Sequence, residues 1–233
     1  MCMAYSGNCV ISNYTQGRDS NRGGCAHSCR FEYSLDFSNI SNIENQKSFF
    51  MSSKDLNGLR VLEEYIRCGI DSVKVEGRMK SHHYAGTVTK VYKQALLHYQ
   101  ETGNFLSKDL LNWSKELNKV SHREYSEANL ITEAGEETIY NERENEENEY
   151  VIACVVVESV KNEFLLVEVR SHFSPKEILE IVPFSKKSTN LEIDWIKSFD
   201  NLEIEKTNPG TLVKIPYHPE AEPYNLIRKK VLQ

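Results

Sequence analysis

The sequence predicts an α/β portion followed by a small all-β domain, and three observations support this. Apolar residues recur at helical spacing on either side of an alternating, strand-like stretch within the first 132 residues. A glutamate-rich run over residues 133–149 then breaks both patterns. From Tyr150 onward, short β-branched and apolar runs alternate with turn sequences. We therefore expect a β/α portion over residues 1–132, an acidic linker over 133–149 and a small β-barrel domain over 150–233.

The first part of the chain is rich in Cys, Gly, Ser and Asn and shows no long helical period. Short strand-like pieces lie at residues 31–33 and 48–51. A helix is expected next, because residues 52–55 supply capping side chains and apolar residues recur at helical spacing over 56–66. Gly69 favours the end of that helix.

A strand, a turn and a helix follow in that order, which is half of the repeating unit of parallel α/β folds. The strand is predicted by alternation over residues 71–76, and Gly77 and Arg78 supply the turn. The expected helices run from Ser81 to about Gln100 and from Lys108 to Asn118.

The region after Tyr150 has the pattern of an antiparallel β domain. Five or six short strands in such a length are typical of a small closed barrel. The predicted strands cover residues 151–160, 164–170, 178–182, 191–195 and 212–215.

The charge is uneven along the chain of 233 residues, whose formal net charge is -6. Residues 1–132 carry a net of +2, residues 133–150 a net of -7 and residues 151–233 a net of -1. A basic footprint along the whole chain, as many nucleic-acid-binding proteins have, is therefore excluded. No apolar run reaches the roughly 18 residues that cross a bilayer, and no signal peptide is evident. We expect a cytoplasmic protein with no membrane partner.

Four of the six cysteines, Cys2, Cys9, Cys25 and Cys29, lie close together at the start of the chain. Clustered thiols in a cytosolic chain suggest a metal site or catalysis more than disulfides. Four thiolates suit either a [4Fe–4S] cluster or a structural zinc site, and the lack of a C-x2-C pair favours iron and sulfur. Four ordinary thiols with no metal remain the alternative. Cys68 and Cys154 stand in apolar surroundings and are expected in the core.

A second candidate site is cationic. Arg78 and Lys80 follow the predicted strand 71–76, at the strand end where parallel α/β folds bind ligands. An arginine there can hold a carboxylate or phosphate through two parallel hydrogen bonds. His122 and Arg123 lie in a later polar loop and could orient an anion or transfer a proton. The alternative is that these residues are ordinary surface side chains.

Five sequence blocks together resemble the collagenase-like peptidase family, family U32. The resemblance covers about residues 1–130, and residues 150–233 are similar to the β-barrel that ends one branch of that family. The matching blocks are residues 1–12, 21–33, 51–56, 73–81 and 121–126.

This resemblance implies a partial TIM-like (β/α) barrel ahead of the β-barrel. It also implies that Cys2, Cys9, Cys25 and Cys29 ligate a [4Fe–4S] cluster. The similar branch carries out prephenate-dependent 5-hydroxylation of the wobble uridine of tRNA, so tRNA and a small anionic metabolite such as prephenate are the expected partners.

Two other functions remain open. One is proteolysis, as the family name says, although no catalytic triad, zinc-protease motif or acid dyad is recognisable. The other is a non-catalytic half-protein that needs a complementary N-terminal chain, because family members carry further β/α units before the block in which Met1 falls. Whether the chain by itself is an enzyme is therefore left open.

Overall fold

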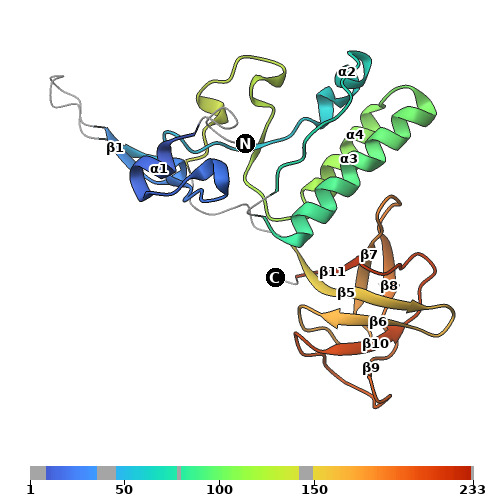
Figure 1. The fold of residues 1–233 in the computed structure, drawn as a ribbon. Helices are drawn as coiled ribbons and strands as arrows, with labels where there is room; N and C mark the ends of the chain where they lie inside the picture. The colour runs from blue at the N-terminus through green and yellow to red at the C-terminus, as the bar shows by residue number, and fades with distance from the viewer. Residues whose placement is uncertain (1–8, 36–45, 78–79, 142–148, 232–233) are drawn as a thin grey trace. The chain divides into compact units, whose positions relative to one another are not determined.

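The computed structural model describes residues 9–35, 46–77, 80–141 and 149–231 (Figure 1). Contacts between residues divide the chain into two compact units. The first unit is Met1–Cys68 with His122–Glu146, and the second is Gly69–Ser121 with Glu147–Gln233. The domain boundaries drawn from the sequence stay a prediction.

The start of the first unit consists of short elements. Helix α1 ends at Gly17, whose φ of 62° lies in the left-handed region that glycine adopts without strain. Strands β1 and β2 pair antiparallel. The elements are α1 (Ile11–Gln16), the 3-10 helices Ser20–Arg22 and Ser28–Arg30, β1 (Tyr33–Leu35) and β2 (Gln46–Ser48).

The rest of the first unit brings three distant segments together. Strand β3 (Asp55–Leu56) pairs parallel with β4 (Tyr125–Ser126). Residues 136–140, which fall in the stretch predicted as a linker, also pack here: Tyr140 is buried and its backbone N donates to the Ser52 carbonyl. The helical elements of this part are the 3-10 helices Leu59–Val61, Ala128–Leu130 and Glu136–Thr138, and α2 (Leu62–Arg67).

Two long helices open the second unit and confirm the sequence prediction. Helix α3 (His82–Thr102) begins after Ser81, whose side chain accepts a hydrogen bond from the Tyr84 backbone N at 3.2 Å. Helix α4 (Ser107–Leu117) packs beside α3. Apolar residues of both helices at helical spacing are buried, which explains why the periodicity was informative. These residues are Tyr84, Val88, Val91 and Ala95 of α3, with Trp113 and Leu117 of α4.

The remainder of the second unit is a curled, antiparallel sheet of seven strands in the order β8-β7-β11-β5-β6-β10-β9 (Figure 1). Its core is apolar and includes Val156, Val167 and Ile181. The strands are β5 (Tyr150–Val160), β6 (Phe164–Val169), β7 (Ile178–Val182), β8 (Thr189–Glu192), β9 (Lys197–Ser198), β10 (Leu212–Pro216) and β11 (Leu226–Lys230).

An all-β C-terminal part is thus confirmed, but closure into a barrel is not. Within the described residues no ladder joins the two outer strands β8 and β9, so the sheet forms a half-barrel. Two strands were missed. Strand β9 has only two residues, and β11 reads LIRKK, in which three basic residues mask the usual alternation.

The prediction of a strand over residues 71–76 is wrong. This stretch has no regular structure, and most of its residues are exposed. A parallel strand needs a neighbour to complete its ladder, and no strand in the described part of the chain pairs with it. The helix expected from Leu56 begins only at Leu59, because Asp55 and Leu56 pair with β4 instead. A parallel TIM-like barrel stays a proposal.

The remaining cysteines differ from each other. Cys154 is buried in the sheet, as predicted, and burial raises the pKa of its thiol. Cys68 is exposed at the end of α2, so the prediction that it belongs to the core is wrong.

In the described residues, no helix is both long and apolar enough to cross a membrane.

Candidate functional site

Arg123 is the centre of a buried polar cluster in the first unit. Its Nη1 donates to the Ser52 hydroxyl at 2.8 Å and to the Ser53 carbonyl at 3.1 Å. Its backbone N donates to Asp55 Oδ2 at 3.1 Å. The guanidinium lies 5.0 Å from the centre of the Tyr140 ring, a cation–π distance. These contacts, from three segments of the chain, fix the direction in which Arg123 points.

The electrostatics of Arg123 link this cluster to the cysteine segment. Burial lowers the pKa of Arg123, and the nearby Arg30 guanidinium lowers it further, whereas Asp55, Tyr140 and Cys29 raise it. Arg30 and Cys29 therefore lie close enough to Arg123 for their charges to act on it. Two guanidinium groups in one neighbourhood repel each other, and an anion between them relieves the repulsion. The arrangement suits a carboxylate or a phosphate.

His122 is held just beside Arg123. Its Nδ1 is 2.6 Å from the Arg123 carbonyl oxygen, and its ring stacks on Tyr125 with the ring centres 4.1 Å apart. A carbonyl only accepts hydrogen bonds, so this contact assigns the proton to Nδ1 and leaves Nε2 as the basic atom. His122 can therefore accept a proton at Nε2 from a fixed ring position.

The three described cysteines of the N-terminal set are half-buried: Cys29 lies in the 3-10 helix Ser28–Arg30, and Cys9 and Cys25 lie in the loops before it. The Cys25 sulfur accepts from the His27 backbone N at 3.4 Å and from the Ser12 hydroxyl at 3.9 Å. A hydrogen bond with the Ser20 side chain, helped by the backbone of Ile11 and Ser12, lowers the pKa of Cys9. Such bonds favour thiolates, the form that binds metals.

The geometry of the described residues holds no ready-made metal site. Among them, no group of three or more His, Cys, Asp or Glu side chains is placed to hold a metal ion. Cys2 lies outside the described residues. The hydrogen bonds at Cys9 and Cys25 fit a group bound by thiolates. Shared ligation by Cys2, Cys9, Cys25 and Cys29 stays a prediction.

The predicted anion pocket is likewise only partly described. Arg78 lies outside the described residues. Lys80 lies before α3 in the second unit, with its Nζ 4.9 Å from the centre of the Tyr84 ring. His122 and Arg123 belong to the first unit. A pocket shared by Arg78, Lys80, His122 and Arg123 stays a prediction.

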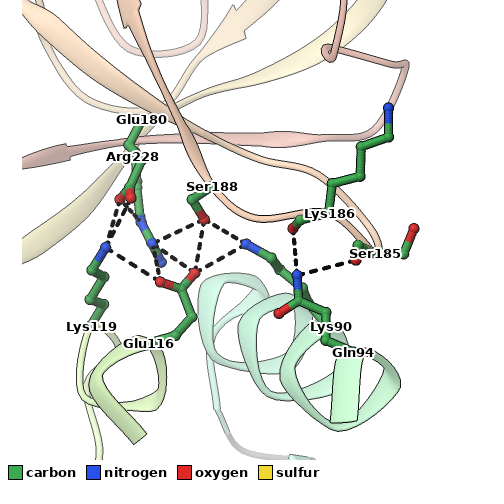
Figure 2. Close-up of polar contacts among 9 residues, drawn as sticks. All are labelled: Lys90, Gln94, Glu116, Lys119, Glu180, Ser185, Lys186, Ser188 and Arg228. Carbon is green, nitrogen blue, oxygen red and sulfur yellow. Dashed lines mark hydrogen bonds and ion pairs between the residues drawn. The ribbon is translucent and has the colours of Figure 1, made fainter. Parts of the chain in front are cut away.

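A buried ion cluster in the second unit escaped the sequence analysis (Figure 2). Arg228 of β11 is fully buried; its Nη2 donates to both Glu116 oxygens at 2.8 and 2.9 Å. Its Nε donates to Glu180 of β7 at 2.7 Å. Lys90 of α3 and Lys119 each donate to one of these two carboxylates. No local pattern could reveal this cluster, because Glu116 and Arg228 are 112 positions apart.

The charges in this ion cluster shift one another's pKa values. Burial raises the pKa of Glu116, but Arg228, Lys90 and Lys119 outweigh it and bring the value to about 2. Burial, and to a smaller extent Arg228, lowers the pKa of the neighbouring His83 from 6.5 to about 4, while Glu116 and Glu180 act in the opposite direction. Every charged group of the ion cluster has a partner of opposite charge, so we interpret the cluster as a structural link between α3, α4 and the sheet.

Serine and aspartate residues around Arg123 were also missed as site residues. In the sequence, Ser52 and Asp55 suggested helix caps. Capping a helix and accepting a hydrogen bond from Arg123 use the same side-chain oxygens, so the sequence could not tell the two roles apart. Tyr140 lay in an acidic stretch and gave no signal. The hydrogen bond between Ser52 and Arg123 joins residues 71 positions apart, so only the folded structure reveals it.

Comparison with known protein families gives two matches along this chain. The family model described as "Peptidase family U32" matches residues 1–140. The model described as "Peptidase family U32 C-terminal domain" matches residues 148–228.

Individual relatives differ in how much of the chain they match. The tRNA hydroxylation protein P1 of Bacillus subtilis (strain 168) is 32% identical over 98% of this chain, which spans 56% of that protein. A collagenase of Porphyromonas gingivalis is 34% identical over 53% of this chain and 34% of its own length. The 23S rRNA 5-hydroxycytidine C2501 synthase of Escherichia coli (strain K12) is 36% identical over 41% of this chain and 14% of its own length. The chain therefore spans about half or less of these relatives.

Proposed function

The chain belongs to peptidase family U32, and from this premise we propose that it takes part in hydroxylating a pyrimidine base of RNA, with the wobble uridine of tRNA as the target. The observation that carries the proposal is the match to a tRNA hydroxylation protein over 98% of the chain. A second relative, by its name, makes 5-hydroxycytidine in rRNA. RNA is then the macromolecular partner.

In this proposal the Arg123 cluster binds the small anionic co-substrate, a carboxylate such as prephenate. Arg30 and Arg123 supply the positive charge, and Ser52, Ser53 and Tyr140 hold the Arg123 guanidinium in place. His122 lies beside this charge with Nε2 as its basic atom. It can take up a proton released when the substrate reacts.

We further propose that Cys2, Cys9, Cys25 and Cys29 hold a [4Fe–4S] cluster, which can transfer electrons or act as a Lewis acid when bound. Supporting this are the hydrogen bonds that the Cys25 sulfur accepts and the lowered pKa of Cys9, since both favour the thiolate form. A structural zinc ion, or no metal, remains the alternative.

Anaerobic purification with visible absorption and iron and sulfide analysis tests the metal proposal. We expect a coloured protein whose iron is lost in Cys9→Ser and in Cys25→Ser. The matched control is Cys68→Ser, an exposed cysteine outside the set, which should keep the iron. A colourless wild type with bound zinc, or equal iron in all variants, would contradict the cluster.

Mass spectrometry of tRNA nucleosides tests the reaction. Unmodified tRNA is incubated with prephenate and the chain, both alone and together with a chain that supplies the N-terminal β/α units of the longer relative. We expect 5-hydroxyuridine with the wild type and at least a tenfold loss in Arg123→Ala. The control Arg60→Ala, whose exposed side chain pairs with Glu127, should keep activity. No hydroxylated base under either condition would contradict the proposed function.

Proteolysis is the second candidate, favoured by the match to a collagenase over 53% of the chain. Gelatin and collagen cleavage, followed with the same preparations, distinguishes it. Release of peptides without base hydroxylation would support the hypothesis that the chain is a peptidase.

A further inference from the structure

The loop over residues 183–188 connects β7 to β8 and is anchored at both ends. Gln94 of α3 donates its side-chain N–H groups to the carbonyls of Ser185, at 3.2 Å, and Lys186, at 2.6 Å. Ser188 accepts from Lys90 Nζ at 2.5 Å and donates to Glu116 at 3.0 Å. Figure 2 shows these contacts along one side of the loop. The loop conformation is thus fixed by its backbone and by Ser188.

The side chains that the loop turns outward are cationic and aromatic. Lys186 and Lys187 are exposed, and Phe184 is 49% exposed. The Lys186 side chain extends away from α3 in Figure 2. No acidic residue occurs between Glu180 and Glu192 in the sequence, and the Glu180 carboxylate is already engaged by Arg228. Two lysines beside a half-exposed ring therefore have no acid of their own loop to neutralise them.

We propose that residues 184–187 form a contact site for a single-stranded segment of RNA. Phe184 stacks on an unpaired base, and Lys186 and Lys187 contact the flanking phosphates, which are the two interactions that single-strand binders combine. Anchoring by Gln94 and Ser188 lowers the entropy lost on binding, because the loop is already ordered. This inference rests on the proposed function, since it adds a binding site for the RNA substrate in the C-terminal part of the chain.

An acidic protein segment could also meet the two lysines, but RNA is favoured by the ring beside them. A base offers both a stacking face to Phe184 and a phosphate within reach of the same loop. Acidic peptide binding is therefore an outcome that the test must separate.

Fluorescence anisotropy with an unmodified tRNA anticodon stem-loop, using the full chain, tests the site. The double variant Lys186→Ala/Lys187→Ala should bind more weakly, with the slope of log K against log salt flattened by about 2. Phe184→Ala should weaken binding roughly 5- to 150-fold, the range for one stacked base. Gln94→Ala should weaken binding to a smaller extent, because it only loosens the loop.

The matched control is Lys161→Ala/Lys206→Ala, which removes two exposed lysines elsewhere in the second unit. It should bind the stem-loop as the wild type does. Equal losses in both double variants would show general cationic attraction and overturn the site. Wild-type-like binding by the loop variants would overturn it while leaving the proposed function intact.

Two further outcomes also decide the matter. If the wild type binds no RNA, both the site and the proposed function fail. If the loop variants lose binding to an acidic peptide but not to the stem-loop, the site serves a protein and the RNA inference is overturned.

Discussion

At the scale of single residues, Arg228 shows how much one buried charge can decide. It is fully buried and forms ion pairs with Glu116 of α4 and Glu180 of β7. A buried pair contributes little net stability compared with apolar residues, but removing one partner leaves a carboxylate buried without its cation. Removing Arg228 is therefore expected to destabilise the fold mainly because Glu116 and Glu180 would be left as buried, unpaired charges.

Arg228→Ala should lower the free energy of unfolding by about 3–5 kcal/mol, because Glu116 and Glu180 lose their shared partner. Urea unfolding followed by circular dichroism measures this. Arg228→Lys should recover part of the loss, since an ammonium cannot bridge both carboxylates in the same way. The control Lys229→Ala breaks a half-exposed pair with Glu177 and should cost less than about 1 kcal/mol. Similar losses in Ala variants of both residues would contradict this account.

His83 should make stability depend on pH. Burial, with help from Arg228, holds its pKa near 4 against 6.5, while Glu116 and Glu180 act in the opposite direction. The unfolded chain therefore binds a proton at higher pH than the folded one. Stability from this residue is complete above pH 6.5 and falls by up to about 3 kcal/mol as the pH drops towards 4.

Urea unfolding at several pH values between 7 and 4.5 measures this, with His83→Gln as the comparison. The variant should show a flatter dependence whatever its absolute stability. Glu116 does not interfere, because its lowered pKa matters only below 4.5. An equally steep dependence in His83→Gln would exclude His83 as the cause.

At the scale of elements, α3 illustrates a boundary set by one side chain. Ser81 accepts from the Tyr84 backbone N and so satisfies one of the free N–H groups at the start of the helix. The same serine predicted the start of the helix from the sequence, since capping is a local interaction.

Ser81→Ala should lower the free energy of unfolding by about 1 kcal/mol, the usual cost of losing a cap. Ser81→Asp should retain stability, because a carboxylate accepts the same hydrogen bond and suits the positive end of the helix. Thermal unfolding of the three proteins side by side measures both. A stable Ala variant with an unstable Asp variant would show that the serine does not act as a cap.

At the scale of the whole molecule, the ion cluster joins parts of the chain that are far apart in sequence. Residues of α3 and α4 meet β7 and β11 through Lys90, Glu116, Glu180 and Arg228. The acidic stretch over residues 133–149 lies between these two parts of the sequence and contains eight glutamates. From the sequence alone, cleavage there would release the β domain.

The structure leads to a different expectation. After a glutamate-specific protease has cut within residues 142–149, the two fragments of the wild type should remain associated in native size-exclusion chromatography. The same fragments from Arg228→Ala should separate more readily, because Glu116 of α4 loses its partner on β11 and only the contacts of Lys90, Gln94 and Lys119 with the sheet remain. Immediate separation of the wild-type fragments would contradict the role of the ion cluster.

The sequence by itself determined those features that depend on neighbouring residues. Helical spacing and the Ser81 cap located α3, and alternation located β5, β6, β7 and β10. The family followed from sequence blocks alone and is confirmed by the matches over residues 1–140 and 148–228.

Only the tertiary structure decided which residues pair across the chain. The alternating stretch 71–76 forms no strand, whereas β11 forms one despite three basic residues, because ladders depend on the neighbouring strand. Arg123, which the sequence offered as an anion-binding residue, and Arg228, which it did not single out, are both buried against partners 71 and 112 positions away. A charge that the fold removes from water needs a partner of opposite charge or a hydrogen bond. Which distant residue supplies that partner depends on the fold, so no local sequence pattern predicts it.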